Sequence, residues 1–225
     1  MLILVLGKGK TGSLVAQVAR ERGHGVRVLD FNENREASAL TAPSLGGVDV
    51  VIDFTNAKAV VKNIRAVLSV GARIVVGTTG WYEQLDEMKA LALRRNGGLL
   101  YGTNFSIGVQ KLFRLTAELA QLEGYQFAIA ETHHESKLDA PSGTAITLQQ
   151  IVEAAQPGAH VEITSHRVGD AKGEHIVTAK GPDDVLELRH DAHNRRAFAL
   201  GAVRAAEWLA GKEGAWDFRE IFDQL

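Results

Sequence analysis

LILVLGKGKTG, residues 2–12, begins as an unbroken apolar run and ends in a loop with three glycines. Four apolar residues follow at the spacing of one helix face: Leu14, Val15, Val18 and Ala19. Residues 26–29 (VRVL) then form a second β-favouring run. Strand, glycine loop, helix and strand is the βαβ order, and strands that are apolar throughout rather than alternating indicate a parallel sheet buried on both faces. The stretch therefore predicts the start of a parallel sheet covered by helices.

The same alternation continues to about residue 103. Further strands are expected at 48–54, 73–76 and 99–101, and helices at 57–70 and 83–94. Strands that alternate with helices over this length are typical of a doubly wound parallel sheet. The sequence therefore predicts an α/β fold with a Rossmann-like first domain.

The pattern changes after residue 104. Helices are expected at 109–122 and 144–155, and strands at 126–131, 161–167, 175–179 and 185–190. Several strands close together predict a smaller α+β domain with a partly antiparallel sheet. The amphipathic run 198–209 is expected to return to the first domain. We therefore assign 1–104 and 195–225 to a dinucleotide-binding domain and 105–194 to a second domain.

The composition excludes several classes of protein. The 225 residues hold 25 Lys+Arg against 27 Asp+Glu, a balance that argues against a nucleic-acid partner. The chain has no cysteine, which excludes disulfides, thiol catalysis and Cys-ligated metals. Leu2–Leu6 is too short for a signal peptide or a membrane span. A cytoplasmic protein without a membrane partner is expected.

The glycine loop has the features of a dinucleotide site. Gly7-x-Gly9-x-x-Gly12 follows a strand and opens a helix, and Asp30 ends the next strand. Glycines let the backbone approach a pyrophosphate, the helix N-terminus donates N–H groups to it, and an acid such as Asp30 binds ribose hydroxyls. The cofactor candidates in this region are Gly7, Lys8, Gly9, Lys10, Thr11, Gly12 and Asp30. The alternative is a structural glycine turn with Asp30 as a surface cap.

The residues after Asp30 bear on the choice between NADH and NADPH. Asp30 would repel a phosphate on the ribose, and the next residues are Phe31 and Asn32 rather than Arg or Lys. This favours NADH. Lys8 and Lys10 could still reach a phosphate from the loop, so NADPH stays open.

A second segment, ETHHESKLDAPSGTA at residues 131–145, runs from a strand end to a helix start. Ser142-Gly143-Thr144 offers hydroxyls and N–H groups at the positive end of that helix, next to two imidazoles and Lys137. This set suits a small carboxylate substrate that must also receive a proton. The paired histidines lack HExxH spacing and an obvious third ligand, so no metal is expected. Lys137 could instead be a solvated surface residue, and Asp139 is interpreted as a helix cap rather than an acid.

The segment His133-His134-x-x-Lys137-x-Asp139-Ala140-Pro141-Ser142-Gly143-Thr144-Ala145 resembles the signature of the dihydrodipicolinate reductase family. Four further pieces agree in the expected order, so the similarity spans almost the entire chain: 51–55 (VIDFT), 77–80 (GTTG), 104–108 (NFSIG) and 195–202 (RAFALGA after Arg195). The resemblance implies NAD(P)H-dependent reduction of (hydroxy)dihydrodipicolinate to tetrahydrodipicolinate in lysine and diaminopimelate biosynthesis.

The resemblance also implies roles for single residues. His133 is the acid/base candidate and Lys137 the proton donor. The substrate carboxylates would be bound by His134, Ser142, Gly143 and Thr144. The nicotinamide side of the cofactor would be lined by Gly77, Thr78, Thr79, Gly102, Thr103, Asn104 and Phe105. The family is typically a homotetramer assembled through the second domain.

The chain departs from the family pattern at two places, and two other functions remain as alternatives. In the family loop the first two glycines are usually three residues apart, whereas here they are Gly7 and Gly9, and Leu6 stands where the family's glycine would align. At the second place, Gly102-Thr103 replaces the usual Ala-Ala or Ala-Pro. One alternative is a related dehydrogenase acting on an amino acid such as aspartate; the block from Lys137 to Thr144 favours the reductase. The other is an NAD(H)-sensing protein without turnover, which would need neither a proton donor nor an anion cradle.

Overall fold

The computed structural model describes residues 1–225 and divides them into two compact units. Unit 1 comprises Met1–Ser106 with Arg196–Leu225, and unit 2 comprises Ile107–Arg195. The C-terminal part of the chain is therefore built into the same unit as the N-terminal part. No helix is both long and apolar enough to cross a lipid bilayer.

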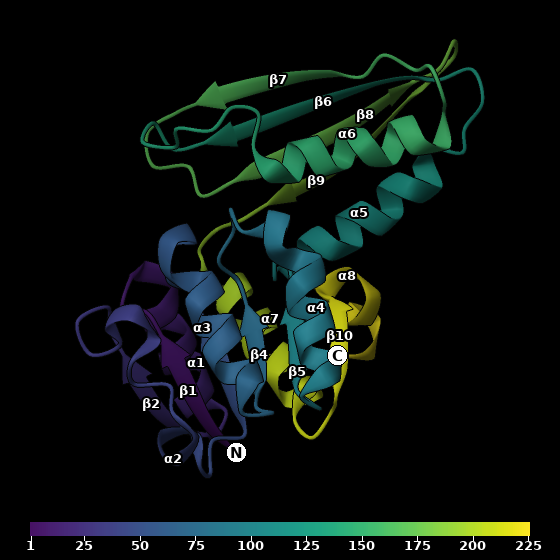
Figure 1. The fold of residues 1–225 in the computed structure, drawn as a ribbon. Coiled ribbons are helices and arrows are strands. Elements are labelled where there is room, and N and C mark those ends of the chain that lie inside the picture. The colour runs from purple at the N-terminus through teal and green to yellow at the C-terminus, as the bar shows by residue number, and fades with distance from the viewer. The chain divides into compact units, whose positions relative to one another are not determined.

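Unit 1 contains one six-stranded sheet in which every pair of neighbours is parallel (Figure 1). Its order is β10-β5-β4-β3-β1-β2. The strands are β1 (Leu2–Leu6), β2 (Gly25–Leu29), β3 (Val50–Asp53), β4 (Arg73–Val76), β5 (Gly98–Tyr101) and β10 (Gly214–Asp217). The doubly wound sheet is confirmed, and β10 is an addition that the sequence did not reveal. The strand order reverses between β1 and β3, which is where such sheets bind ligands.

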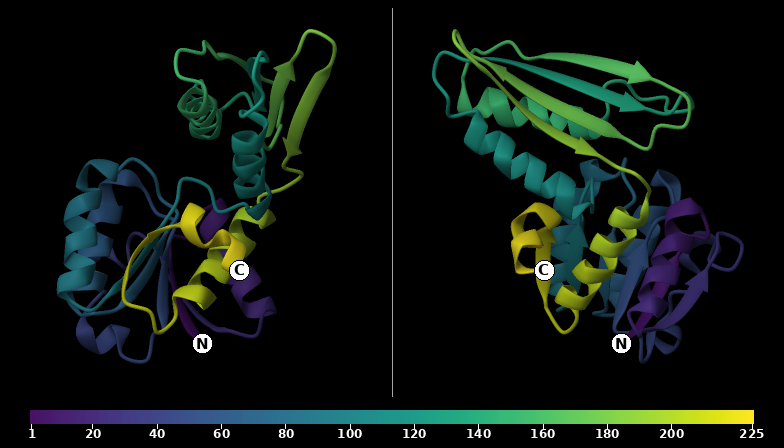
Figure 2. Two further views of the ribbon diagram at one scale, coloured as in Figure 1. Left: turned by 90° about the vertical axis from the view of Figure 1, so that its right-hand side faces the viewer. Right: turned by 180° about the vertical axis from the view of Figure 1, so that it is seen from behind.

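Helices cover both faces of this sheet, which explains why its central strands are apolar throughout. Figure 2 shows α1 (Lys10–Glu21) and α7 (Arg196–Leu209) on one face, and α3 (Ala57–Ser69) and α4 (Leu85–Arg94) on the other. The remaining helical pieces are short: α2 (Ala42–Leu45), α8 (Phe218–Ile221) and 3-10 turns at Arg35–Ala37, Tyr82–Gln84 and Phe222–Gln224. Gly201 lets α7 pack closely against the backbone at Phe105, because a Cβ on Gly201 would lie 1.7 Å from the Phe105 carbonyl oxygen.

Unit 2 is a four-stranded mixed sheet with helices on one face, and the predicted α+β fold with a partly antiparallel sheet is confirmed. Its order is β7-β6-β8-β9; β6 and β7 are parallel and the other two pairs antiparallel. The strands are β6 (Gln126–His133), β7 (Glu162–Arg167), β8 (Glu174–Lys180) and β9 (Val185–Asp191), covered by α5 (Ile107–Leu119) and α6 (Gly143–Ala155).

Burial alternates along β6 and decides which side chains face the helices. Phe127, Ile129, Glu131 and His133 are buried, whereas the residues between them are more exposed. A two-residue period places the four buried side chains on one face of the strand. The apolar row that packs against the helices therefore ends in a carboxylate and an imidazole.

Candidate active site

The glycine loop of unit 1 lies at the switch point and depends on two close approaches. Gly7 has a φ of +102°, and a Cβ on it would lie 2.4 Å from the Phe54 carbonyl oxygen. A Cβ on Gly12 would lie 2.1 Å from the Gly7 carbonyl oxygen. A side chain at either position would collide with these backbone oxygens, so the loop requires glycine at both. The N-cap of α1 is Gly9, which leaves the first-turn N–H groups without a side-chain cap and able to donate to a phosphate.

A cavity of about 310 Å³ opens beside this loop. It contains the predicted residues Gly7, Lys8, Gly9 and Asp30. Other residues around it were not predicted to be site residues: Leu6, Leu29, Phe31, Asn34, Phe54, Thr55, Asn56, Ala59 and Asn63. The close-packed glycines, the uncapped helix end and this cavity fit one half of a dinucleotide.

Asp30 is fixed at the cavity by its own turn. Its Oδ1 accepts from the N–H groups of Asn32 (2.9 Å) and Glu33 (3.0 Å). These backbone hydrogen bonds, that from Glu33 first, and the Lys8 ammonium hold the pKa of Asp30 below its usual value. Lys8 Nζ lies 3.3 Å from Asp30 Oδ2 and 2.8 Å from Glu33 Oε2. Lys8, a predicted cofactor residue, thus pairs with two carboxylates. The sequence did not predict Glu33 as a site residue.

Asp53, at the end of β3, organises the next loop. This buried carboxylate accepts from Thr55 N, Thr55 Oγ and Thr78 Oγ through Oδ1, and from Asn63 Nδ2 through Oδ2. Burial raises the pKa of Asp53, and these hydrogen bonds oppose the rise. Gly77 is also constrained, since a Cβ would lie 2.2 Å from the Phe54 ring. The predicted residues Gly77 and Thr78 are therefore locked to β3, while Thr79 is exposed.

The segment after β5 is packed against the C-terminal part of unit 1. A Cβ on Gly102 would lie 2.9 Å from Phe218 Cβ, and the ring centroids of Phe105 and Phe218 are 4.5 Å apart. Asn104 Oδ1 accepts from Ser106 N at 2.9 Å, whereas Thr103 is exposed. The predicted cofactor residues thus follow the carboxyl ends of β1, β2, β4 and β5, all on one edge of the sheet.

In unit 2, the segment 134–141 is a loop between β6 and α6. Lys137 Nζ lies 2.8 Å from both carboxylate oxygens of Asp139, and this hydrogen bond lowers the pKa of Asp139. The interpretation of Asp139 as a helix cap is therefore wrong. The N-cap of α6 is Ser142, whose Oγ accepts from Ala145 N. His134 Nδ1 lies 2.8 Å from Ser136 Oγ.

The first turn of α6 is only partly available to a ligand. The Ser142 N–H donates to Glu131 Oε1 at 3.2 Å, and its hydroxyl lies 3.2 Å from His175 Nε2. Both polar groups of Ser142 are thus used within unit 2. Gly143 is exposed with open space where a Cβ would stand, and Thr144 is half-buried. Gly143 therefore offers more open space to a ligand than Ser142 does.

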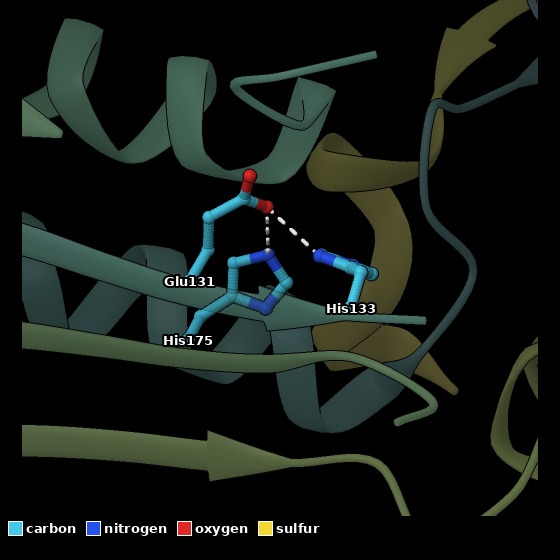
Figure 3. Close-up of side chains that lie close together, drawn as sticks. All are labelled: Glu131, His133 and His175. Atoms are coloured by element: carbon cyan, nitrogen blue, oxygen red, sulfur yellow. Dashed lines mark ion pairs between the residues drawn. The ribbon is translucent and has the colours of Figure 1, made fainter. Parts of the chain in front are cut away.

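Behind this loop lies a buried cluster of Glu131, His133 and His175 (Figure 3). Glu131 Oε2 lies 2.9 Å from His133 Nδ1 and 4.0 Å from His175 Nε2. Burial alone would raise the pKa of Glu131, but hydrogen bonds that include those from Ser142 and Arg167 bring it down to about 2. Burial lowers the pKa of His133, and it lowers that of His175 to about 3. At neutral pH the cluster therefore holds one carboxylate and two neutral imidazoles.

Sequence reasoning missed most of this cluster. Glu131 lay in the quoted segment without a role, although the i, i+2 spacing would have placed it beside His133. His175 pairs with Glu131 across β6 and β8, which depends on a register that the sequence does not give. The three ligand atoms lie within 4.8 Å of one another, so the fold supplies the third potential metal ligand that the sequence appeared to lack. The absence of a metal stays a prediction.

Comparison with known proteins agrees with both units. Residues 1–105 match the family model for the N-terminus of dihydrodipicolinate reductase, and residues 108–222 match the model for its C-terminus. A 4-hydroxy-tetrahydrodipicolinate reductase from Christiangramia forsetii is 34% identical over an alignment of 242 positions, which covers 100% of this chain and 99% of the relative. A second such reductase, from Natronomonas pharaonis, is 37% identical over an alignment of 246 positions, which covers 98% of this chain and 99% of the relative.

Solved structures show the same architecture. A dipicolinate-bound dihydrodipicolinate reductase from Paenisporosarcina sp. TG-14 is 25% identical with a TM-score of 0.81, covering 100% of this chain and 99% of that one. An aspartate dehydrogenase from Thermotoga maritima has a TM-score of 0.52 at 13% identity, covering 93% and 96%, a likeness of fold alone. Both halves of the chain match the same family, and relatives match from end to end. The chain belongs to the dihydrodipicolinate reductase family.

Proposed function

We propose that this chain is a 4-hydroxy-tetrahydrodipicolinate reductase, reducing (hydroxy)dihydrodipicolinate to tetrahydrodipicolinate with NADH or NADPH. One observation carries the proposal: a single loop and its flanks hold an imidazole (His133), an ammonium (Lys137) and the exposed start of helix α6 at Gly143. These groups suit a dicarboxylate that must be protonated after reduction. Unit 1 supplies the dinucleotide edge, with Gly7, Gly12 and Asp30 in the roles assigned above.

Different residues of unit 2 would bind the charged substrate and supply the proton. The bound nicotinamide supplies the hydride to the conjugated ring of the substrate, and the product of that attack needs a proton. Lys137 is our proton donor, and its side chain is 21% exposed and paired with Asp139 in the free protein. A substrate carboxylate would compete with Asp139 for the ammonium. His134 and the α6 N-terminus, through Gly143 and Thr144, would bind the substrate carboxylates, and neutral His133 stays the acid/base candidate.

The turn after β2 supports a preference for NADH. A ribose phosphate would meet two carboxylates, Asp30 and Glu33, and Lys8 is already bound by both. Ribose hydroxyls, by contrast, would donate to Asp30. Lys10, exposed at the start of α1, is the remaining cation for a phosphate, so NADPH is expected to be a poorer but usable reductant.

We also propose a homotetramer assembled through unit 2, in the cytoplasm where nicotinamide cofactors are found. Support comes from the sheet face opposite α5 and α6, which no helix of unit 2 covers (Figure 2). Along β6 and β8 that face carries Ala128, Ala130, Ile176 and Thr178. Small and apolar residues on an open sheet face suit packing against a second copy.

One coupled assay tests the proposed reaction. Pyruvate, aspartate semialdehyde and the upstream synthase generate the substrate, and the oxidation of NADH and of NADPH is followed separately at 340 nm, about the absorbance maximum of reduced nicotinamide. We expect synthase-dependent oxidation, with no oxidation of L-aspartate by NAD⁺ in a parallel reaction. Turnover of L-aspartate alone would establish the aspartate dehydrogenase, and binding of NADH without turnover of either substrate would indicate a sensor.

A further inference from the structure

Glu131 contacts His133, Ser142 and Arg167 and has no place in the proposed chemistry. It is 0% exposed and stands two residues before His133 on β6, directly opposite His175 on β8. Figure 3 shows its carboxylate pointing at both rings. An ionised carboxylate in such surroundings is costly to bury unless each oxygen has partners.

One oxygen of Glu131 ties the substrate loop to the sheet. Oε1 accepts from Ser142 N, at the cap of α6, and from Arg167 Nη2 at 3.0 Å. Arg167 also donates through Nη2 to the Asp139 carbonyl oxygen (2.6 Å) and through Nε to that of Lys137 (3.3 Å). The ion pair of Glu131 and Arg167 thus holds both ends of the segment that carries Lys137.

The other oxygen of Glu131 faces the imidazole of His133. Oε2 and His133 Nδ1 are 2.9 Å apart and both are buried, and the contact is an ion pair without the angles of a hydrogen bond. A proton on Nδ1 would be attracted to the carboxylate oxygen at this distance, whereas a proton on Nε2 would set two lone pairs against each other. The Nδ1–H form leaves Nε2 as the basic nitrogen of the ring.

Gly173 lies close to the other ring nitrogen of His133, Nε2. Gly173 has a φ of +137°, and a Cβ on it would lie 3.0 Å from His133 Nε2. Any side chain at residue 173 would therefore crowd this nitrogen. The charged or titratable groups that act on His133 are Glu131 from β6, His175 from β8, Arg167 from β7 and Lys137 from the loop. Glu131 is the single anion among them.

We propose that Glu131 is a positioning residue for the reductase reaction: it fixes the Nδ1–H tautomer of His133, so that Nε2 is the nitrogen that exchanges protons, and through Arg167 it holds the Lys137 loop. This inference rests on the proposed function for its catalytic meaning. The geometry of the tautomer does not, and it can be measured without substrate.

Glu131→Gln gives a sharp test because the two oxygens have different partners. The amide oxygen is needed by Ser142 N and Arg167, so the amide NH₂ must face His133 Nδ1. An NH₂ group requires an acceptor, which forces the His133 proton to Nε2. The variant should therefore reverse the tautomer. Glu153→Gln, which removes an exposed carboxylate from α6, is the matched control.

The tautomer is read by long-range ¹H–¹⁵N correlation spectra of the free protein, with His133 assigned from the His133→Gln spectrum. We expect Nδ1–H in the wild type and in Glu153→Gln, and Nε2–H in Glu131→Gln. A wild-type ring protonated at Nε2 would overturn the proposal without any variant, which covers the case in which Glu131→Gln does not fold. An unchanged tautomer in folded Glu131→Gln would overturn it as well.

Kinetics then connect the tautomer to turnover. In the coupled assay, Glu131→Gln should lose about 10²-fold or more in kcat, the range of a disabled acid/base group, with the KM for NADH unchanged. Wild-type kcat in a variant whose tautomer has reversed would defeat the positioning role. If the wild type shows no reductase activity, the proposed function fails, while the tautomer measurement still decides the role of Glu131.

Discussion

Asp53→Asn should destabilise unit 1 even though the side chains are nearly the same size. Asp53 ends a one-way chain of hydrogen bonds: Ala39 N–H donates to Asn34 Oδ1, Asn34 Nδ2 to Asn63 Oδ1, and Asn63 Nδ2 to Asp53 Oδ2. An asparagine at 53 keeps its oxygen for Thr55 and therefore presents NH₂ to the NH₂ of Asn63. Flipping Asn63 moves the mismatch to Asn34, and flipping Asn34 moves it to the backbone N–H of Ala39, which cannot flip.

The expected cost follows from one buried donor without an acceptor, about 1–3 kcal/mol. Loss of the charge-assisted hydrogen bonds to Asp53 adds to this cost, and removal of a buried charge, whose pKa is raised by burial, offsets part of it. A net loss of about 2 kcal/mol corresponds to a drop in Tm of about 4–8 °C for a protein of this size. Differential scanning calorimetry at pH 7 measures it.

A second substitution provides the control. Asn34→Asp in the Asp53→Asn background puts an acceptor-only carboxylate at the other end of the chain, where it can accept from both Ala39 N–H and a flipped Asn63. We expect the double variant to recover most of the lost Tm, although Asn34→Asp alone should also be destabilising. If Asp53→Asn melts within 1 °C of wild type, or the double variant is worse than the sum of the singles, the one-way chain is not what stabilises this region; the 1 °C limit is about 0.3–0.5 kcal/mol.

Three further outcomes are expected. Lys137→Met should lower kcat in the coupled assay by about 10²–10⁴-fold and leave the Kd for NADH unchanged, as judged by cofactor fluorescence; near-wild-type turnover would remove Lys137 as the proton donor. Asp30→Ala should raise the Kd for NADH more than that for NADPH, and a wild type that prefers NADPH by more than about tenfold would reverse our assignment of the turn. The pKa of Glu131 is lowered to about 2 from an ordinary 4.5, so its contribution to stability is present above pH 4.5 and is lost as the pH falls toward 2. This contribution is of order 3 kcal/mol, and acid unfolding followed by circular dichroism should be less steep in Glu131→Gln.

Local patterns were enough to predict the parallel sheet and most helices, because each of those elements carries its own periodicity. The glycine loop could also be predicted, since Gly7 and Gly12, where the backbone requires glycine, belong to one short motif in the sequence. The edge strand β10 was missed because Gly214–Asp217 is short and becomes a strand only by pairing with β5.

The candidate site was predicted only where its residues are neighbours in sequence. His133, Lys137 and Thr144 share one loop and its flanks, but Arg167 and His175 reach Glu131 from two other strands. Their positions depend on strand register, which no local pattern encodes. Asp139 illustrates the opposite error: a residue typical of a helix cap bonds instead to the ammonium two residues before it.

The division of the chain also sets an order for its folding during synthesis. Unit 2 is one continuous stretch, Ile107–Arg195, whereas unit 1 needs α7 and β10, which the ribosome makes last. The smaller unit is therefore complete while the larger one still exposes the sheet face that α7 covers and the edge of β5. Because unpaired strand edges invite aggregation, this interval is the vulnerable period of biogenesis. Ribosome-bound chains stalled once residue 195 has emerged from the exit tunnel should show a protease-resistant unit 2 and a protease-sensitive unit 1; equal resistance of both would contradict this order.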